Sequence, residues 1–289
     1  MGRFVPLSIP NFEGNERKYV DDALDQGWVS TGGAYITELE EKLAEFLQVK
    51  KTAAVQSGTS ALHLSLIACG VQPGDMVIVP TLTFIAAVNP VRYQFAEPVF
   101  MDCDDSLRMD PLKLRRFCEN ECVTEDGQLK HKATGKTVKA IVVVHVFGNM
   151  ADMEAIMDIA QEFHLKVIED ATEALGTQYT KGRYAGKFAG TIGDFGAYSF
   201  NGNKIITGSS GGCFLTDDEE AANKVRKWST QARENAAWYQ HEELGYNYRM
   251  SNVVAGVVRG QFSYLNEHIA QKKAIYERYK EGLKGLPVS

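Results

Sequence analysis

The sequence predicts an α/β fold, with a mainly parallel sheet sandwiched by helices. Short apolar segments of strand length alternate with longer amphipathic segments of helix length between residues 53 and 169, and this alternation is typical of parallel strands joined by crossover helices. Turns rich in glycine, serine and threonine follow several strand segments. With 289 residues, the chain is long enough for one large domain and part of a second.

Two amphipathic helices are expected at residues 16–26 and 35–47, after an N-terminal arm. The alternating region predicts strands at residues 53–56, 76–79, 98–101, 140–144 and 167–169, and helices at residues 60–69, 85–93, 111–118 and 153–163. Later elements are strands at residues 197–200 and 213–216, a helix at 218–231 and a long helical stretch at 251–283. We therefore expect a large domain over residues 1–250 and the start of a smaller one over residues 251–289.

A polar segment at residues 119–136 interrupts the alternation. It contains Asp126-Gly127 and Thr134-Gly135, and an Asp-Gly pair is a strong signal for a two-residue hairpin turn. We expect this segment to form a hairpin on the surface of the protein.

Composition and charge restrict the class of protein. The net charge is -6, whereas a nucleic-acid-binding surface normally gives a basic balance, so we expect no nucleic-acid partner. No apolar run approaches the roughly 20 residues that cross a bilayer, and the N-terminal residues lack the apolar region of a secretion signal. We expect no membrane partner and a cytoplasmic location.

The five cysteines are scattered and odd in number, which favours free thiols in a reducing compartment. Cys118 and Cys122, with His131 nearby, suggest a zinc site as the alternative. Structural zinc sites usually draw on a second closely spaced pair of ligands. The sequence has no such pair here, so we expect no metal.

Turns at the carboxyl ends of strands are where ligands bind in open α/β sheets. After the strand at residues 53–56, Ser57-Gly58-Thr59 opens a helix, and a helix N-terminus with hydroxyl groups is suited to an anion. The alternative is a plain helix cap without a ligand. After the strand at residues 167–169, Asp170 is placed to hold a protonated ring nitrogen or a metal. The alternative is a pair of ordinary turn acids, with Glu169 as the exposed one.

Residues 193–212 read GDFGAYSFNGNKIITGSSGG and carry a single lysine, Lys204, in a glycine-rich loop. Because glycine permits close backbone approach, Lys204 is a candidate Schiff-base amine; the alternative is a solvated loop lysine. Ser199 offers a further hydroxyl for a phosphate. Phe84 follows another strand and is placed to stack on a flat ligand, although packing in a core is the commoner fate of phenylalanine.

Two other nucleotide motifs are excluded. Residues 182–187 (GRYAGK) are one residue too short for a P-loop and are followed by Phe188 instead of Ser or Thr. The first strand is not followed by GxGxxG. An anion-binding turn, a strand-end acid, a stacking ring and a late lysine together match the needs of pyridoxal phosphate.

Five segments resemble, in order and spacing, the motifs of the DegT/StrS sugar aminotransferases. They are SGTSALHLSL at residues 57–66, PTLTFIAAVN at 80–89, EDATEALG at 169–176, GDFGAYSFNGNK at 193–204 and GYNYRMSN at 245–252. The resemblance covers nearly the whole chain. It implies the fold of type I pyridoxal phosphate enzymes, with a seven-stranded type of sheet. The closest likeness is to the branch that aminates UDP-linked 4-keto-6-deoxy-N-acetylhexosamines.

The resemblance also implies roles for individual residues. Lys204 corresponds to the lysine that forms the Schiff base and later moves a proton, Asp170 to the partner of the pyridinium nitrogen, and Phe84 to the stacking ring. The implied ligands of the cofactor phosphate are Gly58, Thr59, Ser199 and, lent by the neighbouring subunit, Asn247. Glu173 stands where the family often has histidine, and its role is left open.

The implied activity is transfer of an amino group from L-glutamate to C4 of a nucleotide-linked keto sugar, in a homodimer with shared active sites. Dehydratases of the family replace the lysine with histidine, so Lys204 argues against that alternative. The other alternative is a non-catalytic protein that binds the cofactor or has a regulatory role. Family members usually continue past a helix such as that at residues 251–283, so we expect the small C-terminal domain to be incomplete here.

Overall fold

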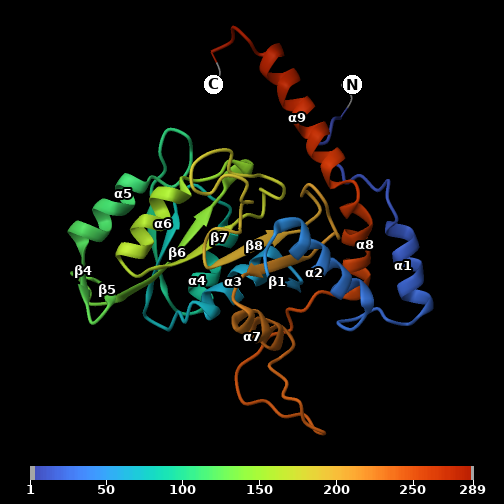
Figure 1. The fold of residues 1–289 in the computed structure, drawn as a ribbon, viewed down its shortest axis with the longest axis horizontal. Coiled ribbons are helices and arrows are strands. Elements are labelled where there is room, and N and C mark those ends of the chain that lie inside the picture. The colour runs from blue at the N-terminus through green and yellow to red at the C-terminus, as the bar shows by residue number, and fades with distance from the viewer. Residues whose placement is uncertain (1–3, 288–289) are drawn as a thin grey trace.

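The computed structural model describes residues 4–287, and its centre is a twisted sheet (Figure 1). Seven strands follow one another across the sheet in the order β1-β9-β8-β7-β6-β2-β3. Their bounds are β1 (Lys51–Val55), β2 (Met76–Pro80), β3 (Glu97–Met101), β6 (Thr137–Val144), β7 (Lys166–Asp170), β8 (Phe195–Ser199) and β9 (Gly212–Thr216). Strands β3, β2, β6, β7 and β8 pair in parallel, whereas β9 is antiparallel to both of its neighbours. The predicted α/β fold with a mainly parallel sheet is confirmed.

Helices cover both faces of this sheet. The described helices are α1 (Glu16–Asp25), α2 (Ala34–Leu47), α3 (Gly58–Ala68), α4 (Asn89–Tyr93), α5 (Pro111–Arg116), α6 (Met153–Glu162), α7 (Glu219–Ser229), α8 (Asn252–Phe262) and α9 (Leu265–Gly282), with short helical turns η1 (Ile85–Ala87), η2 (Phe117–Glu121) and η3 (Val146–Gly148). On one face, α3, α4 and α7 share a buried apolar cluster with the strands. On the other face, α2 and α8 form a second cluster, and α5 and α6 form a third.

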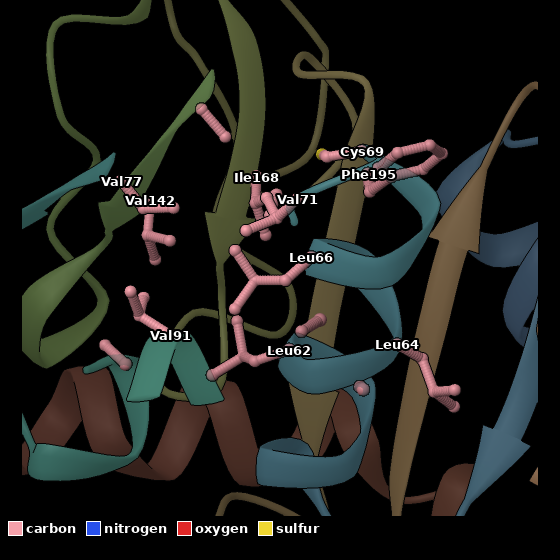
Figure 2. Close-up of a cluster of buried hydrophobic side chains, with 14 of the residues drawn as sticks. Leu62, Leu64, Leu66, Cys69, Val71, Val77, Val91, Val142, Ile168 and Phe195 are labelled. Atoms are coloured by element: carbon pink, nitrogen blue, oxygen red, sulfur yellow. The ribbon is translucent and has the colours of Figure 1, made fainter. Parts of the chain in front are cut away.

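Helix α3 is central to the fold because it packs across the middle of the sheet. Figure 2 shows Leu62 and Leu66 of α3 beside Ile168 of β7, with Val142 of β6 close by. Most of its residues are buried and apolar, the composition expected of a helix that is covered on all sides. The N-terminus of α3 is therefore fixed relative to the ends of β7 and β8.

The polar segment forms the expected hairpin. Strands β4 (Cys122–Glu125) and β5 (Gln128–His131) pair antiparallel, and β5 extends the sheet by pairing with the start of β6. Asp126 and Gly127 both have left-handed backbone angles, φ 51° and 73°, as a type I′ hairpin turn requires.

Two helix predictions need correction. Residues 85–93 form the short turn η1 followed by α4 instead of one helix, because Pro90 has no N–H to donate to a preceding turn. Residues 251–283 form two helices, α8 and α9, separated at Ser263 and Tyr264. The Ser263 hydroxyl donates to the Gly260 carbonyl oxygen at 3.3 Å, a local bond that competes with continued helix.

Helix α8 packs against α1 and α2, whereas α9 extends away from the body of the protein (Figure 1). On α9 the buried side chains are Leu265 and His268. The division into domains at residue 250 stays a prediction. Among residues 4–287, no helix combines the length and the apolar character needed to span a membrane.

Candidate active site

A cavity of about 720 Å³ lies at the carboxyl ends of β6, β7 and β8. It is lined by most of the residues that the sequence singled out: Ser57, Gly58, Thr59, Phe84, Asp170, Glu173, Ser199 and Lys204. These positions are spread over nearly 150 residues of sequence and come together because parallel strands end at the same edge of a sheet.

The N-terminus of α3 forms one end of the cavity. Ser57 caps the helix, because its Oγ accepts the Ser60 N–H at 3.1 Å. A Cβ atom on Gly58 would lie 2.9 Å from both the Ser199 Cβ and the Thr172 Cγ2, so only glycine fits between these side chains. The helix cap that the alternative predicted is present. The helix dipole and the hydroxyl groups at the same N-terminus also suit a phosphate.

Asp170 ends β7 and is 5% exposed. One carboxylate oxygen accepts the Thr172 N–H at 3.1 Å, and no cationic side chain within residues 4–287 forms a salt bridge with it. Burial raises the pKa of Asp170 above its usual value, although the Thr172 hydrogen bonds and the charge of Lys204 oppose the shift. A buried acid that faces the cavity without a salt-bridge partner in the described chain fits a protonated ring nitrogen.

The alternative that Glu169 is an exposed turn acid is wrong. Its side chain is fully buried and accepts hydrogen bonds from the N–H groups of Gly190 (2.9 Å), Ile192 (2.6 Å) and Gly193 (2.5 Å) and from His145 Nε2 (2.7 Å). Burial alone would raise its pKa, but these hydrogen bonds and the nearby His145 hold it below the usual value. Glu169 therefore stabilises the fold around the cavity.

Lys204 lies at the other side of the cavity, on the loop between β8 and β9. Its side chain is only 15% exposed, and its Nζ lies 3.5 Å from Glu173 Oε1. The backbone of the loop is fixed by bonds from Lys204 N to Asn201 O (3.0 Å) and from Gly208 N to Phe200 O (3.0 Å). The alternative that Lys204 is a freely solvated loop lysine is therefore wrong.

Phe84 is 78% exposed and lines the cavity, so the alternative of core packing is wrong. Asn247 lies outside the cavity residues of its own subunit and pairs with Thr230 through an isolated β-bridge. Its contribution to the site of a neighbouring subunit stays a prediction.

Further residues line the cavity that the sequence did not single out, among them His145, Thr172, Asn201 and Asn203. His145 directly follows β6, so the same strand-end argument that found Asp170 was available for it. In the described part of the chain, no group of three or more His, Cys, Asp or Glu side chains is arranged to hold a metal ion.

This cavity joins a capped helix N-terminus, a buried acid and a half-buried lysine, a combination that suits a phosphorylated, ring-containing carbonyl compound. The model of the DegT/DnrJ/EryC1/StrS aminotransferase family matches residues 10–289. The chain belongs to this family, as the sequence motifs predicted.

Several relatives share most of the chain. EpsN of Bacillus subtilis, which carries the name of a pyridoxal phosphate-dependent aminotransferase, is 41% identical over 98% of this chain and 69% of its own length. GDP-perosamine synthase of Escherichia coli O157:H7 is 37% identical over 98% of this chain and 72% of its own. A DegT DnrJ EryC1 StrS aminotransferase from Brucella abortus has a TM-score of 0.84 at 29% identity, over 93% of this chain and 69% of its own.

Proposed function

We propose that this protein is a pyridoxal phosphate-dependent aminotransferase that moves an amino group from L-glutamate to C4 of a nucleotide-linked 4-keto-6-deoxy sugar. The observation that carries the proposal is the convergence of Lys204, Asp170 and the N-terminus of α3 on one cavity. The names of EpsN and GDP-perosamine synthase support the cofactor and the sugar class.

The residues present fit the cofactor at each end. Gly58, Thr59 and Ser199 would hold the phosphate at the end of the cavity where a Cβ on Gly58 would meet the Ser199 and Thr172 side chains. Asp170 would hold the ring nitrogen and supply the negative charge that keeps it protonated. When bound, pyridoxal phosphate supplies an aldehyde for amines and a ring that accepts electrons.

Lys204 performs the proton transfers. With pyridoxal phosphate bound, the neutral Nζ of Lys204 would be the base that takes the proton from the donor α-carbon and later returns a proton. Phe84 covers a flat ligand at the mouth of the cavity, and Asn247 of a second subunit completes the phosphate site in a homodimer.

Two sugar nucleotides are candidates for the acceptor. The sequence motifs favour a UDP-linked 4-keto-6-deoxy-N-acetylhexosamine, whereas the similarity to GDP-perosamine synthase favours the GDP-linked keto precursor of that product. Assays with both acceptors, followed by mass spectrometry of the amino sugar, decide between them.

The first test is the visible absorbance of the protein with pyridoxal phosphate, before and after addition of L-glutamate. We expect a band that Lys204→Ala abolishes, that L-glutamate removes, and that the control Lys224→Ala leaves unchanged, because Lys224 lies on the exposed side of α7. A wild-type protein that binds no cofactor, or a band that persists in Lys204→Ala, would contradict the proposal.

A further inference from the structure

The ion pair between Lys204 and Glu173 divides the two oxygens of one carboxylate between two partners. Glu173 Oε2 accepts the backbone N–H of Phe147 at 2.9 Å. Its Oε1 lies 3.5 Å from Lys204 Nζ. The first bond fixes the direction of the carboxylate, so the second oxygen is held toward the lysine.

Two packed turns support this arrangement. The turn that carries Glu173 lies against η3, because the Thr177 hydroxyl donates to the Gly148 carbonyl oxygen at 3.2 Å. A Cβ atom on Gly148 would lie 3.1 Å from the Glu173 carbonyl oxygen. The backbone of Glu173 therefore stays close to η3, at the distance that the Phe147 hydrogen bond needs.

Asp170 and Glu173 both line the cavity, but their surroundings differ. Asp170 is almost fully buried and has no salt-bridge partner in the described chain. Glu173 keeps 37% of its side chain exposed and is the carboxylate paired with Lys204 there. The charge of Asp170 is available to a ring nitrogen, whereas the charge of Glu173 is directed at the lysine amine.

We infer that Glu173 is a positioning residue that receives Lys204 whenever the lysine is detached from the cofactor. This inference rests on the proposed function. The proton from the donor α-carbon goes to the neutral Nζ of Lys204, which becomes an ammonium group; that proton then leaves Nζ for the accepting carbon. Glu173 gains and loses no proton, and its charge holds the ammonium group in place between the two transfers.

Removing the carboxylate has opposite consequences for two steps. The ion pair must break before Nζ can reach the cofactor aldehyde, so Glu173→Gln frees the amine for capture. The ammonium group also loses its fixed position during proton transfer, so that step slows. A purely structural role would slow both steps.

The test uses full-length Glu173→Gln, wild-type protein and the control Glu162→Gln, which removes an exposed carboxylate on α6. Capture of pyridoxal phosphate by cofactor-free protein is followed by absorbance, and labelling of Lys204 by an acylating reagent without cofactor is followed by mass spectrometry. Exchange of the L-glutamate α-hydrogen with deuterium from solvent is followed by NMR.

We expect Glu173→Gln to raise capture and labelling about two- to fivefold, because partly exposed ion pairs are weak. We expect it to lower the exchange rate about 10- to 100-fold, the cost of a misplaced reacting group. An unchanged exchange rate, or capture, labelling and exchange that all fall together, overturns the inference. Absence of exchange in the wild type refutes the proposed function instead.

Discussion

Amide substitutions at Glu169 and Asp170 are expected to change the stability of the cofactor-free protein in opposite directions. The two carboxylates are adjacent on β7 and both are buried. Glu169 has four hydrogen-bond donors, whereas Asp170 has the Thr172 N–H and faces the cavity. The pKa of Glu169 is lowered and that of Asp170 is raised.

The magnitudes follow from these surroundings. In Glu169→Gln, an NH₂ group replaces one acceptor oxygen and meets backbone N–H groups or His145, so a buried charged network is broken at a cost of about 3–5 kcal/mol. Asp170→Asn keeps an oxygen for the Thr172 N–H and removes a buried charge. We expect a gain of about 0.5–2 kcal/mol, the usual size of stabilisation when a functional site is relaxed.

The pH dependence has opposite signs at the two positions. The stabilisation from ionised Glu169 is present above the unfolded pKa of 4.5 and is lost as the pH falls through the lower folded value. The stability linked to protonated Asp170 is present below its unfolded pKa of 3.8 and is lost as the pH rises through the higher folded value. The advantage of Asp170→Asn should therefore be greatest above the raised folded pKa of Asp170 and disappear toward pH 3.8.

Urea denaturation of the cofactor-free proteins at pH 7 and at lower pH measures both effects. With pyridoxal phosphate added, the wild type should gain stability and Asp170→Asn should gain much less, because its amide offers no charge to the ring nitrogen. The reasoning fails if Asp170→Asn is less stable than the wild type at pH 7. It also fails if Glu169→Gln is as stable as the wild type.

Three further predictions concern positions around the site. Gly58→Ala places a Cβ 2.9 Å from the Ser199 Cβ. We expect urea denaturation to show a loss of about 1–3 kcal/mol in the free energy of unfolding, and titration to show weaker cofactor binding. An unchanged affinity for the cofactor would contradict this. Gln261→Leu removes two hydrogen bonds to the Thr207 backbone, at 3.1 and 2.7 Å. We expect the free energy of unfolding to fall by about 1–3 kcal/mol for each buried backbone group left unpaired. A thermal midpoint equal to that of the wild type would refute this prediction. Burial lowers the pKa of His63 from 6.5 to about 4, so the wild type should lose stability as the pH falls from 6.5 to 4. Denaturation of His63→Phe at the same pH values should not show this loss.

The sequence predicted where the cavity lies because a topological rule was sufficient. Strand-sized and helix-sized segments alternate, so Ser57 and Asp170 could be placed at the same edge of a sheet before any contact was known. The alternation also identified the hairpin at residues 119–136, since a segment that breaks the pattern and contains Asp-Gly has few other structures available.

The environment of each side chain could not be predicted in this way. Burial of Glu169 depends on donors at residues 190–193 and on His145, which approach it only in the folded chain. The break between α8 and α9 depends on a local bond of Ser263 in a segment whose pattern suits one continuous helix. The burial of Glu169 and the break between α8 and α9 depend on tertiary contacts or on hydrogen-bond geometry. The periodicity of apolar residues in a sequence carries no information about either.

Three carboxylates within residues 169–173 show how the fold gives one residue type different roles. Successive residues of a strand point to opposite faces, so Glu169 meets the loop at residues 190–193 while its neighbour Asp170 meets the cavity. The turn after β7 then brings Glu173 back to the same cavity, beside η3 and Lys204. Hydrogen-bond donors surround the first carboxylate, the second faces the cavity without a salt-bridge partner in the described chain, and a lysine pairs with the third. Because these surroundings and not the residue type determine each charge's effect, exchanging the acids between positions should not preserve function.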